Sequence, residues 1–236
     1  MSSKSPFMKQ KEILSSIQPD LKVEDMEDAD HPVSNYNTPL KANAFDMSDD
    51  EKINKIEGHF REIMEIMGLD LQDDSLQGTP RRVAKMYVKE IFAGLNPANK
   101  PVIRLFENKY RYNEMLVEKE ITFYSNCEHH FVPIIGKAHV GYFSSGKVVG
   151  LSKINRIVQY YARRPQVQER MTEQIANELR QSLDTDDVAV VIDATHLCVA
   201  SRGVNDTNST TGTAHFSGKF EQKEVRKEFL DFINSK

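Results

Sequence analysis

The 236-residue chain has few cysteines, no long apolar run and no excess of positive charge. No apolar segment approaches the roughly 20 residues that span a bilayer, and the first residues show no signal-peptide pattern. We therefore expect a cytoplasmic protein with no membrane partner. The formal charge is −4, from 31 basic and 35 acidic residues, which argues against a general nucleic-acid binder.

Cysteine occurs twice, as Cys127 and Cys198. In a reducing compartment a single disulfide is not expected, so metal binding or catalysis is the default role for both residues. The alternative is that both are small buried hydrophobic residues, which is common for free cysteine.

The composition divides the chain into three regions. Residues 1–47 carry an acidic run from Val23 to Asp30 and scattered prolines, which predicts a disordered arm, with a regulatory or partner-docking arm as the alternative. Residues 48–100 are predicted to be helical. Residues 101–236 are predicted to form the main, β-rich domain. Since 39% of all residues are hydrophobic, the chain can bury a sizeable core.

Two helices are predicted in the N-terminal helical region. Ser48 and Glu51 form a capping-box pattern, apolar residues follow at helical spacing, and Gly68 ends the helix. A second helix is predicted with Thr79 as its cap and Pro80 as its first residue. Basic residues crowd its first turn against the helix dipole, which either a bound anion or a solvated face would explain.

Strands and helices alternate after residue 100. The predicted strands are Ile121–Ser125, Val132–Phe143, Val188–Ala194 and Thr211–Phe220. Lys147–Gly150 is predicted to continue the first hairpin. Two helices follow, with Ser152 as the cap of the first and Pro165 at the start of the second, and another helix ends the chain. This order predicts an α+β fold with an antiparallel sheet.

Both cysteines stand beside histidines, in the segments Cys127–His130 and His196–Cys198. Zinc favours thiolate and imidazole ligands, and Cys-x-x-His places two of them around one tight turn. Cys198 would add a third ligand from a strand, leaving one position for water, as in catalytic zinc sites. A structural zinc with His129 or His196 as fourth ligand is the alternative. If residues 196–198 are extended, His196 shares a face with Cys198 and is free for proton transfer.

Several basic residues could bind an anion. Ser152 and Lys153 lie at a predicted helix start, with Arg156 one turn later, and helix N-termini present free N–H groups to anions. Arg202 lies four residues after Cys198. Taken singly, each is more often a solvated charge, but together they could hold a triphosphate.

The remaining polar positions are less specific. Gln168 and Glu169 begin a predicted helix, where a carboxylate could accept the N–H groups of a guanine edge, although exposed Glu is common there. His139 lies inside an apolar strand and is expected to be an ordinary sheet residue. His215 is given no role.

Three segments resemble the signature blocks of the GTP cyclohydrolase I family: residues 125–142, 148–170 and 193–204. The resemblance extends over roughly Ser48 to Lys236, and its motifs are long and correctly spaced. It implies a tunnelling fold, in which two helices cover one face of a four-stranded antiparallel sheet, preceded by N-terminal helices. Residues 101–236 would then be the catalytic tunnelling-fold domain. It also implies a homodecamer of two stacked pentamers, with active sites between subunits.

The resemblance implies that GTP is hydrolysed to 7,8-dihydroneopterin triphosphate and formate, at the start of folate or pterin biosynthesis. It assigns zinc (Zn2+) as the cofactor, with Cys127, His130 and Cys198 as its ligands. The catalytic positions are His129, His196 and Ser152. The substrate-binding positions are Gln168, Glu169, Lys153, Arg156, Arg202, Arg82 and Lys85. In the implied mechanism, zinc-activated water attacks C8 of guanine, His129 delivers a proton to the imidazole nitrogen, and His196 protonates the ribose oxygen.

Two other functions are weighed against this one. A tunnelling-fold nitrile reductase of deazaguanine metabolism would need a nucleophilic cysteine free of metal, whereas both cysteines here belong to metal-type patterns. A catalytically inactive, zinc-stabilised binding protein would tolerate the loss of His129 and His196, and both are present.

Overall fold

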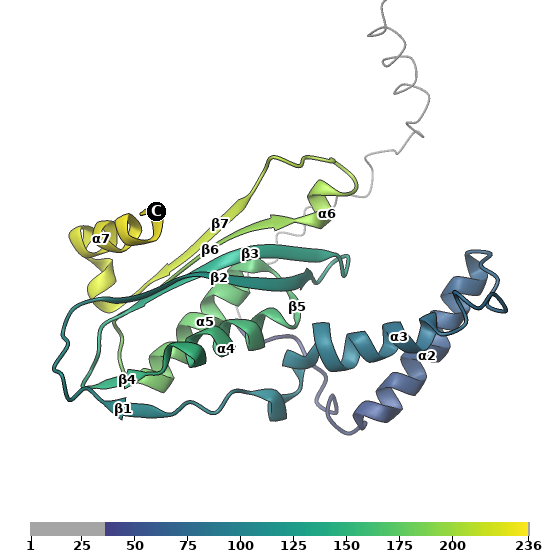
Figure 1. Cartoon of the computed structure of the whole chain (residues 1–236), viewed down its shortest axis with the longest axis horizontal. Coiled ribbons are helices and arrows are strands. Elements are labelled where there is room, and N and C mark those ends of the chain that lie inside the picture. The colour runs from purple at the N-terminus through teal and green to yellow at the C-terminus, as the bar shows by residue number, and fades with distance from the viewer. Residues whose placement is uncertain (1–35, 236) are drawn as a thin grey trace, which may run out of the picture. The chain divides into compact units, whose positions relative to one another are not determined.

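The computed structural model describes residues 36–235 and has an α+β fold with N-terminal helices, as expected (Figure 1). The helices are α2 (Asp49–Ile66), α3 (Thr79–Met86), α4 (Leu151–Ala162), α5 (Gln168–Leu183), α6 (Leu197–Ala200) and α7 (Lys223–Asn234). The strands are β1 (Leu105–Glu107), β2 (Leu116–Cys127), β3 (Pro133–Tyr142), β4 (Lys147–Val149), β5 (Pro165–Gln166), β6 (Val188–His196) and β7 (Thr211–Phe216). The disordered arm predicted for residues 1–47 falls largely on residues 1–35, outside the described range, and the domain boundaries remain predictions.

Helix α2 begins with the capping box that its sequence predicts. The Ser48 hydroxyl accepts a hydrogen bond from the Glu51 N–H at 3.3 Å, and the Glu51 carboxylate accepts one from the Ser48 N–H at 2.8 Å. Each bond satisfies a donor that the first turn of a helix leaves unpaired. The helix ends at Met67, and Gly68 follows with φ +81°, a backbone angle that glycine adopts without strain.

The predicted cap of α3 is wrong by one residue. Gly78 is the N-cap, Thr79 is the first helical residue, and Pro80 falls at the second position, where its missing N–H has no helical partner in any case. The helix then continues into a π-helical turn, η2 (Tyr87–Ile91). Gly94 packs against α4, since a Cβ there would lie 2.0 Å from the Tyr160 carbonyl oxygen.

The main sheet has five strands in the order β5-β2-β3-β6-β7. The four predicted strands β2, β3, β6 and β7 pair antiparallel, and β5 adds a short parallel edge beside the end of β2. Pro165 therefore does not open a helix as predicted. Its segment pairs with Asn126 and Cys127, and α5 begins after the extended residue Val167.

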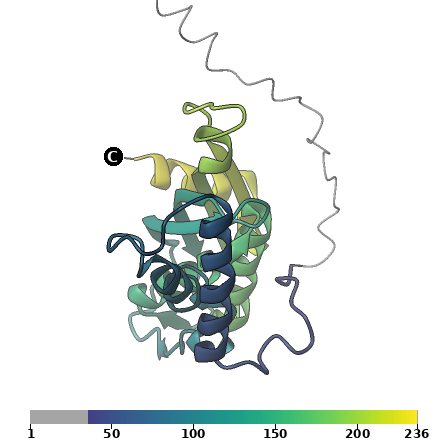
Figure 2. The same ribbon diagram turned by 90° about the vertical axis from the view of Figure 1, so that its right-hand side faces the viewer.

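The two faces of the sheet carry separate hydrophobic cores. Helices α4 and α5 cover one face, as predicted, with Phe123, Ile157 and Ile175 fully buried in one cluster (Figures 1 and 2). Helix α7 packs on the other face, where Phe220 and Phe229 are fully buried. Burial of each such side chain contributes about 1.5–3 kcal/mol, so the sheet is held from both sides.

Two local predictions near α4 are corrected. Residues Lys147–Val149 do not continue the β2–β3 hairpin, because the turn at Ser144–Gly146 redirects the chain and β4 pairs antiparallel with β1. Gly150, not Ser152, is the N-cap of α4. Ser152 lies one position inside the helix and is exposed, and no side chain caps this end.

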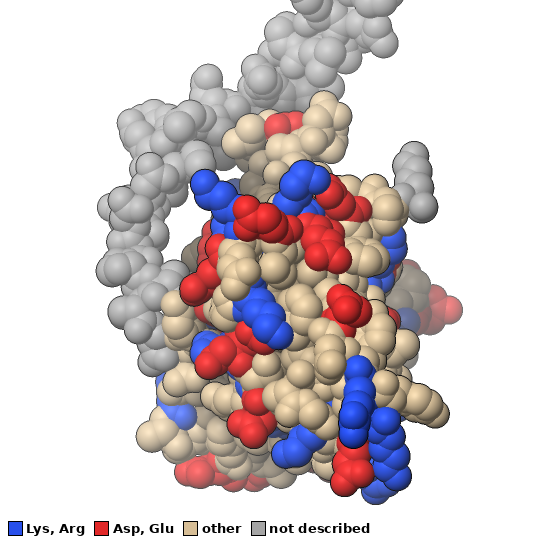
Figure 3. All heavy atoms as spheres, turned by 90° about the vertical axis from the view of Figure 1, so that its left-hand side faces the viewer, with Lys and Arg blue, Asp and Glu red and all other residues tan. Residues whose placement is uncertain are grey.

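The described surface has one projecting segment and one face of mixed charge. The segment after α6 projects beyond the sheet, and its residues are mostly exposed (Figure 2). On the face seen in Figure 3, basic and acidic side chains are interspersed, so that face has no patch of one sign. Within residues 36–235, no helix combines the length and apolar character that crossing a membrane requires.

Candidate active site

Three residues meet at the end of the sheet where β2 and β6 finish. Cys127 ends β2, His130 lies in the following turn, and Cys198 lies in α6. Their potential ligand atoms all lie within 4.8 Å of one another. Two thiols and an imidazole are the donor types that zinc prefers, so these three residues, the candidate metal-binding group, have the composition to hold a zinc ion.

The route by which Cys198 reaches this group differs from the prediction. The chain is not extended over residues 196–198, because His196 is the last residue of β6 and Leu197 begins the short helix α6. The helical turn brings Cys198 back toward Cys127. Burial and the neighbouring Cys127 both raise the pKa of the Cys198 thiol in the metal-free protein.

The turn between β2 and β3 is tightly hydrogen-bonded. The Cys127 N–H donates to the Val132 carbonyl at 2.9 Å, and the Phe131 N–H donates to the Cys127 carbonyl at 2.9 Å. Phe131 adopts φ +51°, which is unfavourable for a side chain of its size, and its ring packs 5.2 Å from that of Phe92. The turn is therefore held in one conformation from within and from the segment that follows α3.

Both histidines of this turn lie beside the Cys127 sulfur. The Nδ1 atom of His130 lies 3.8 Å from Sγ of Cys127, and Nδ1 of His129 lies 3.6 Å from it. The His129 side chain is 56% exposed, and its Nε2 lies 3.9 Å from Oε1 of Glu128. Among the described residues, His129 does not join the compact group of three potential metal ligands.

His196 is held by a buried glutamine. Gln168 is 1% exposed, and its Nε2 donates to the carbonyl oxygens of Ile192 at 3.1 Å and Thr211 at 2.8 Å. Because carbonyls only accept, these bonds orient the amide and leave its Oε1 facing Nε2 of His196 at 2.8 Å. His196 therefore carries its proton on Nε2. Burial lowers the pKa of His196, while the nearby Glu169 acts in the opposite direction.

Glu169 and Arg202 are exposed at the same end of the sheet. Glu169 lies in the first turn of α5, close enough to His196 to affect its pKa. Arg202 follows α6 and lowers the pKa of Cys198, against the larger effect of burial. The structure thus brings together the three metal-binding residues with His129, His196, Gln168, Glu169 and Arg202.

Ser152, Lys153 and Arg156 do not join this group. In the first turns of α4, the Asn155 side chain donates to Glu118 near the start of β2 at 2.9 Å, whereas Cys127 ends that strand. Glu118 and Cys127 are nine positions apart, which is at most about 30 Å at about 3.3 Å per residue, and the β-bulge between Glu118 and Ile121 shortens this path. In Figure 1, α4 begins beside β4 and ends near β5.

Arg82 and Lys85 lie on the exposed side of α3. Neither side chain forms an ion pair with another described residue, and the same is true of Lys153, Arg156 and Arg202. These five basic side chains are available to a ligand. Arg81, the residue before Arg82, is instead paired with Glu57 of α2 at 2.9 Å.

Sequence comparison identifies the family. A sequence model described as GTP cyclohydrolase I matches residues 56–234. The chain is 60% identical over 203 residues to GTP cyclohydrolase 1 of Flavobacterium johnsoniae, covering 86% of this chain and 91% of the relative. It is 57% identical to the Aeromonas hydrophila protein and 56% identical to that of Vibrio vulnificus strain YJ016, each of the same name, over 82% of this chain and 88% of each relative.

The chain belongs to the GTP cyclohydrolase I family. This confirms the resemblance carried by the Cys127–His130 and His196–Cys198 segments. The match to the family covers every residue predicted for the site, from Arg82 to Arg202, whereas residues 1–55 lie outside it.

One pair of residues in this family member was not predicted from sequence. Arg170 of α5 donates to both carboxylate oxygens of Glu128, which lies between the metal-binding residues Cys127 and His130. A signal was available, because a basic side chain in the first turn of a helix opposes the helix dipole and needs an acidic partner. Spacing alone does not identify that partner.

Proposed function

We propose that this protein is a GTP cyclohydrolase I with the tunnelling fold, which hydrolyses GTP to 7,8-dihydroneopterin triphosphate and formate. The observation that carries the proposal is the gathering of Cys127, His130 and Cys198 within 4.8 Å, beside two histidines and an exposed glutamate. It is supported by relatives of that name that are 56–60% identical to the chain.

The proposed cofactor is zinc, held by Cys127, His130 and Cys198. Bound there, zinc supplies Lewis acidity and activates water for attack on C8 of the guanine ring. The protein contributes proton transfer. His129 has its Nδ1 beside the Cys127 sulfur, and its Nε2 lies 3.9 Å from Glu128 on a side chain that is 56% exposed, so Nε2 is the atom that delivers a proton to the imidazole nitrogen of the opening ring.

His196 acts on the sugar in this proposal. Its Nε2–H is committed to Gln168, so Nδ1 is the atom that exchanges a proton with the ribose oxygen. Glu169 recognises the base, because an exposed carboxylate beside His196 can accept both N–H groups of the guanine edge. Gln168 then supports His196 and does not contact guanine itself, since its amide is fully used within the protein.

The triphosphate is proposed to bind the basic residues at the start of α4, with Arg202, Arg82 and Lys85 as further contacts. Lys153 and Arg156 lie in the first turns of α4, beside the start of β2, whereas the metal-binding group of the same chain lies where β2 ends, so we infer that these residues and that group do not serve the same GTP molecule. A complete site therefore needs Ser152, Lys153 and Arg156 from a second copy. This supports a homo-oligomer with shared sites, which the family resemblance extends to a decamer.

Subunit mixing tests the shared site. Cys198→Ser is expected to be inactive, and Lys153→Ala to be nearly inactive when GTP is supplied at about the wild-type KM. If each site takes Lys153 from one copy and Cys198 from another, refolding the two variants together restores a fraction of the sites. Measured GTP turnover in the mixture well above that of either variant alone is the expected result. A mixture no more active than its parts contradicts the shared site.

Formate release tests the reaction. The purified protein is incubated with GTP, and formate is measured before chelation, after a zinc chelator, and after zinc is restored. We expect one formate per GTP, lost on chelation and regained with zinc. A folded, zinc-loaded protein that binds GTP and releases no formate would instead be a binding protein.

A further inference from the structure

We propose that Arg170 and Glu128 act as a positioning pair, which fixes the metal-binding turn to the first turn of α5. The proposal rests on the zinc site proposed above and adds two residues to it. Neither residue is a metal ligand, and neither is among the substrate contacts. Their role is to set where the turn lies relative to His196 and Glu169.

Glu128 is tied to α5 and its preceding strand by both backbone and side chain. Its N–H donates to the Gln166 carbonyl at 3.0 Å. Its two carboxylate oxygens accept from the two terminal nitrogens of Arg170, the longer of these bonds being 3.2 Å. A bidentate arginine–carboxylate pair restricts orientation as well as distance. Glu128, the residue after Cys127, is therefore the point at which the turn is anchored.

Because both side chains are largely buried, each charge of this pair needs the other as its partner. The Arg170 side chain is 10% exposed and that of Glu128 is 24% exposed. The Nε atom of Arg170 is buried without a hydrogen-bond partner among the described residues, so Glu128 provides the compensation for a nearly buried positive charge. Removal of one partner from such a pair leaves an uncompensated charge, and the surrounding chain must move to hydrate it.

Three consecutive residues of α5 serve different parts of the site. Gln168 binds His196, two residues before the ligand Cys198. Arg170 binds Glu128, one residue after the ligand Cys127. Glu169 lies between them and is exposed. One rigid helical turn thus contacts both chain segments that supply metal ligands, and it carries the proposed guanine-binding carboxylate in fixed relation to them.

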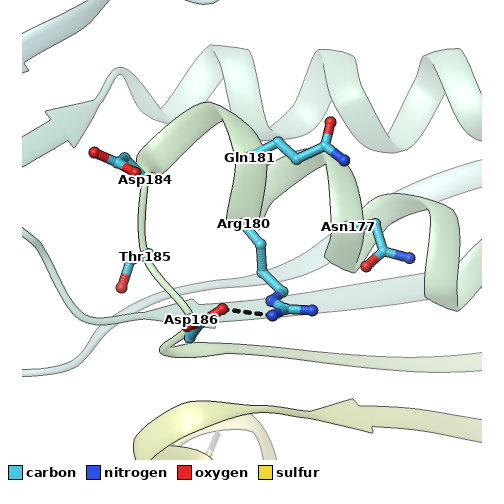
Figure 4. A pocket seen from close by; sticks show the side chains of 6 residues that line it. All are labelled: Asn177, Arg180, Gln181, Asp184, Thr185 and Asp186. Atoms are coloured by element: carbon cyan, nitrogen blue, oxygen red, sulfur yellow. Dashed lines mark hydrogen bonds and ion pairs between the residues drawn. The ribbon is translucent and has the colours of Figure 1, made fainter.

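The other end of the same helix provides a matched control. Arg180 pairs with Asp186 at the wall of a shallow pocket of about 340 Å³, lined also by Asn177, Gln181, Asp184 and Thr185 (Figure 4). Its side chain is 36% exposed, and the pair lies at the C-terminal end of α5, away from the metal-binding group. Arg180→Gln removes an arginine–carboxylate pair from α5 without touching the site.

The experiment compares Glu128→Gln, Arg170→Gln, the double variant, Arg170→Lys and Arg180→Gln. The zinc dissociation constant is measured by competition with a chromogenic chelator. Cobalt(II) is then substituted for zinc, because its visible d–d bands report the geometry of the ligand set independently of activity. Thermal unfolding of the metal-free proteins separates weaker metal binding from general loss of stability.

We expect each single Gln variant to weaken zinc binding about tenfold and to alter the cobalt spectrum, as loss of outer residues does at other metal sites. The double variant should bind zinc no more weakly than the single variant with the lower zinc affinity, since the two residues act as a unit. Arg170→Lys should fall between Arg170→Gln and wild type, because it keeps the charge but loses the bidentate contact. Arg180→Gln should match wild type in both measurements.

Zinc affinities within twofold of wild type in both Glu128→Gln and Arg170→Gln, with unchanged cobalt spectra, would overturn the proposal. An equal loss in Arg180→Gln would also overturn it, because the effect would then be general. If Arg170→Gln does not fold, Glu128→Gln and Arg170→Lys decide the matter by the same criteria. If the wild-type protein releases no formate from GTP, the proposed function fails, while the zinc and cobalt measurements still decide the role of this pair.

Discussion

The two ends of the main sheet carry different kinds of polar residue. At the end near α6, the buried and half-buried polar side chains have protein partners, while Glu169 and Arg202 are exposed: Gln168 binds His196, Arg170 binds Glu128, and the Cys127 sulfur lies beside two histidines. At the end where α4 begins, Ser152 and Arg156 are exposed, and Lys153 and Arg156 form no ion pair with any described residue.

This contrast indicates which half of the site the single chain completes. The metal-binding end is organised in advance by buried hydrogen bonds, so its geometry is present before any ligand arrives. At the α4 end, the basic side chains of that helix are not held by ion pairs with other described residues. They can therefore adjust to a flexible, strongly charged triphosphate bound at a site of a partner subunit. We therefore expect changes at the first end to affect metal binding and turnover, and changes at the second to affect the affinity for GTP.

The largest effect is expected from Cys198→Ser. It removes one of three metal-binding side chains, so zinc should be lost and formate release should fall by roughly a thousandfold or more, because water is then no longer activated. Zinc content by atomic absorption and formate release from GTP check this together. A Cys198→Ser protein with full zinc and full turnover would show that the metal group is assigned wrongly.

A smaller effect on turnover is expected from Gln168→Met, which keeps the volume but removes the amide. The His196 Nε2–H and the carbonyls of Ile192 and Thr211 lose their partner, at a cost of about 1–3 kcal/mol in the free energy of unfolding. We expect kcat to fall about 10- to 100-fold with KM for GTP nearly unchanged. A rise in KM at constant kcat would mean that Gln168 contacts guanine after all.

Arg156→Ala is expected to show the opposite division of kinetic effects. Loss of a charged contact to phosphate is worth about 1.5–3 kcal/mol, so KM for GTP should rise about 10- to 100-fold while zinc affinity stays that of wild type. Lys147→Ala is the matched control, because Lys147 is an exposed cation on the strand just before α4. Equal effects of the two substitutions on KM would reduce the role of Arg156 to general electrostatic attraction.

The smallest effect concerns His139, on the sheet but outside the site. It is 6% exposed, and its Nδ1 accepts from the Glu120 N–H at 3.3 Å. Burial lowers the pKa of His139 below its ordinary value of 6.5. The negative charges of Glu120 and Asp193 each act in the opposite direction and less strongly than burial, whereas the positive charges of Lys119 and Lys137 lower this pKa further. Below pH 6.5 the unfolded chain then binds the additional proton, so stability from this residue is lost as the pH falls.

His139→Gln keeps an acceptor for Glu120 and cannot be protonated. We expect its free energy of unfolding to depend less on pH between 7 and 5.5 than that of wild type, with zinc affinity unchanged. Denaturant titrations at several pH values measure this. Identical pH dependence in the two proteins would show that His139 is not buried in the neutral form.

Much of the fold followed from local patterns. The capping box at Ser48 and Glu51, the apolar spacing of α5 and the β-branched run of β6 each predicted an element that the structure contains. The errors lie at boundaries and short elements. Gly78 and Gly150, rather than Thr79 and Ser152, occupy the caps, because backbone geometry at these entries leaves the hydroxyl side chains inside the first turn.

Short elements escaped prediction because partners distant in sequence determine them. Strand β5 has two residues and exists because the end of β2 pairs with it, and β4 pairs with β1 although a hairpin partner is nearer in sequence. Helix α6 has four residues, too few for any periodicity. In each case the local sequence permits several conformations, and a contact made elsewhere selects one.

The sequence alone determined the chemistry of the site. The residue types and order in Cys127–His130 and His196–Cys198 specify soft, zinc-type donors beside proton-transfer groups, and such donor identity does not depend on the fold. Tertiary structure decided which residues hold these groups in place. It also decided that the basic residues at the start of α4 lie away from the metal-binding group of the same chain. The bonds from Gln168 to His196 and from Arg170 to Glu128 cross 28 and 42 residues of chain, and the distance from Cys127 to the start of α4 follows from the sheet. Pairings over such separations are set by how the helices pack on the sheet, which no local pattern contains.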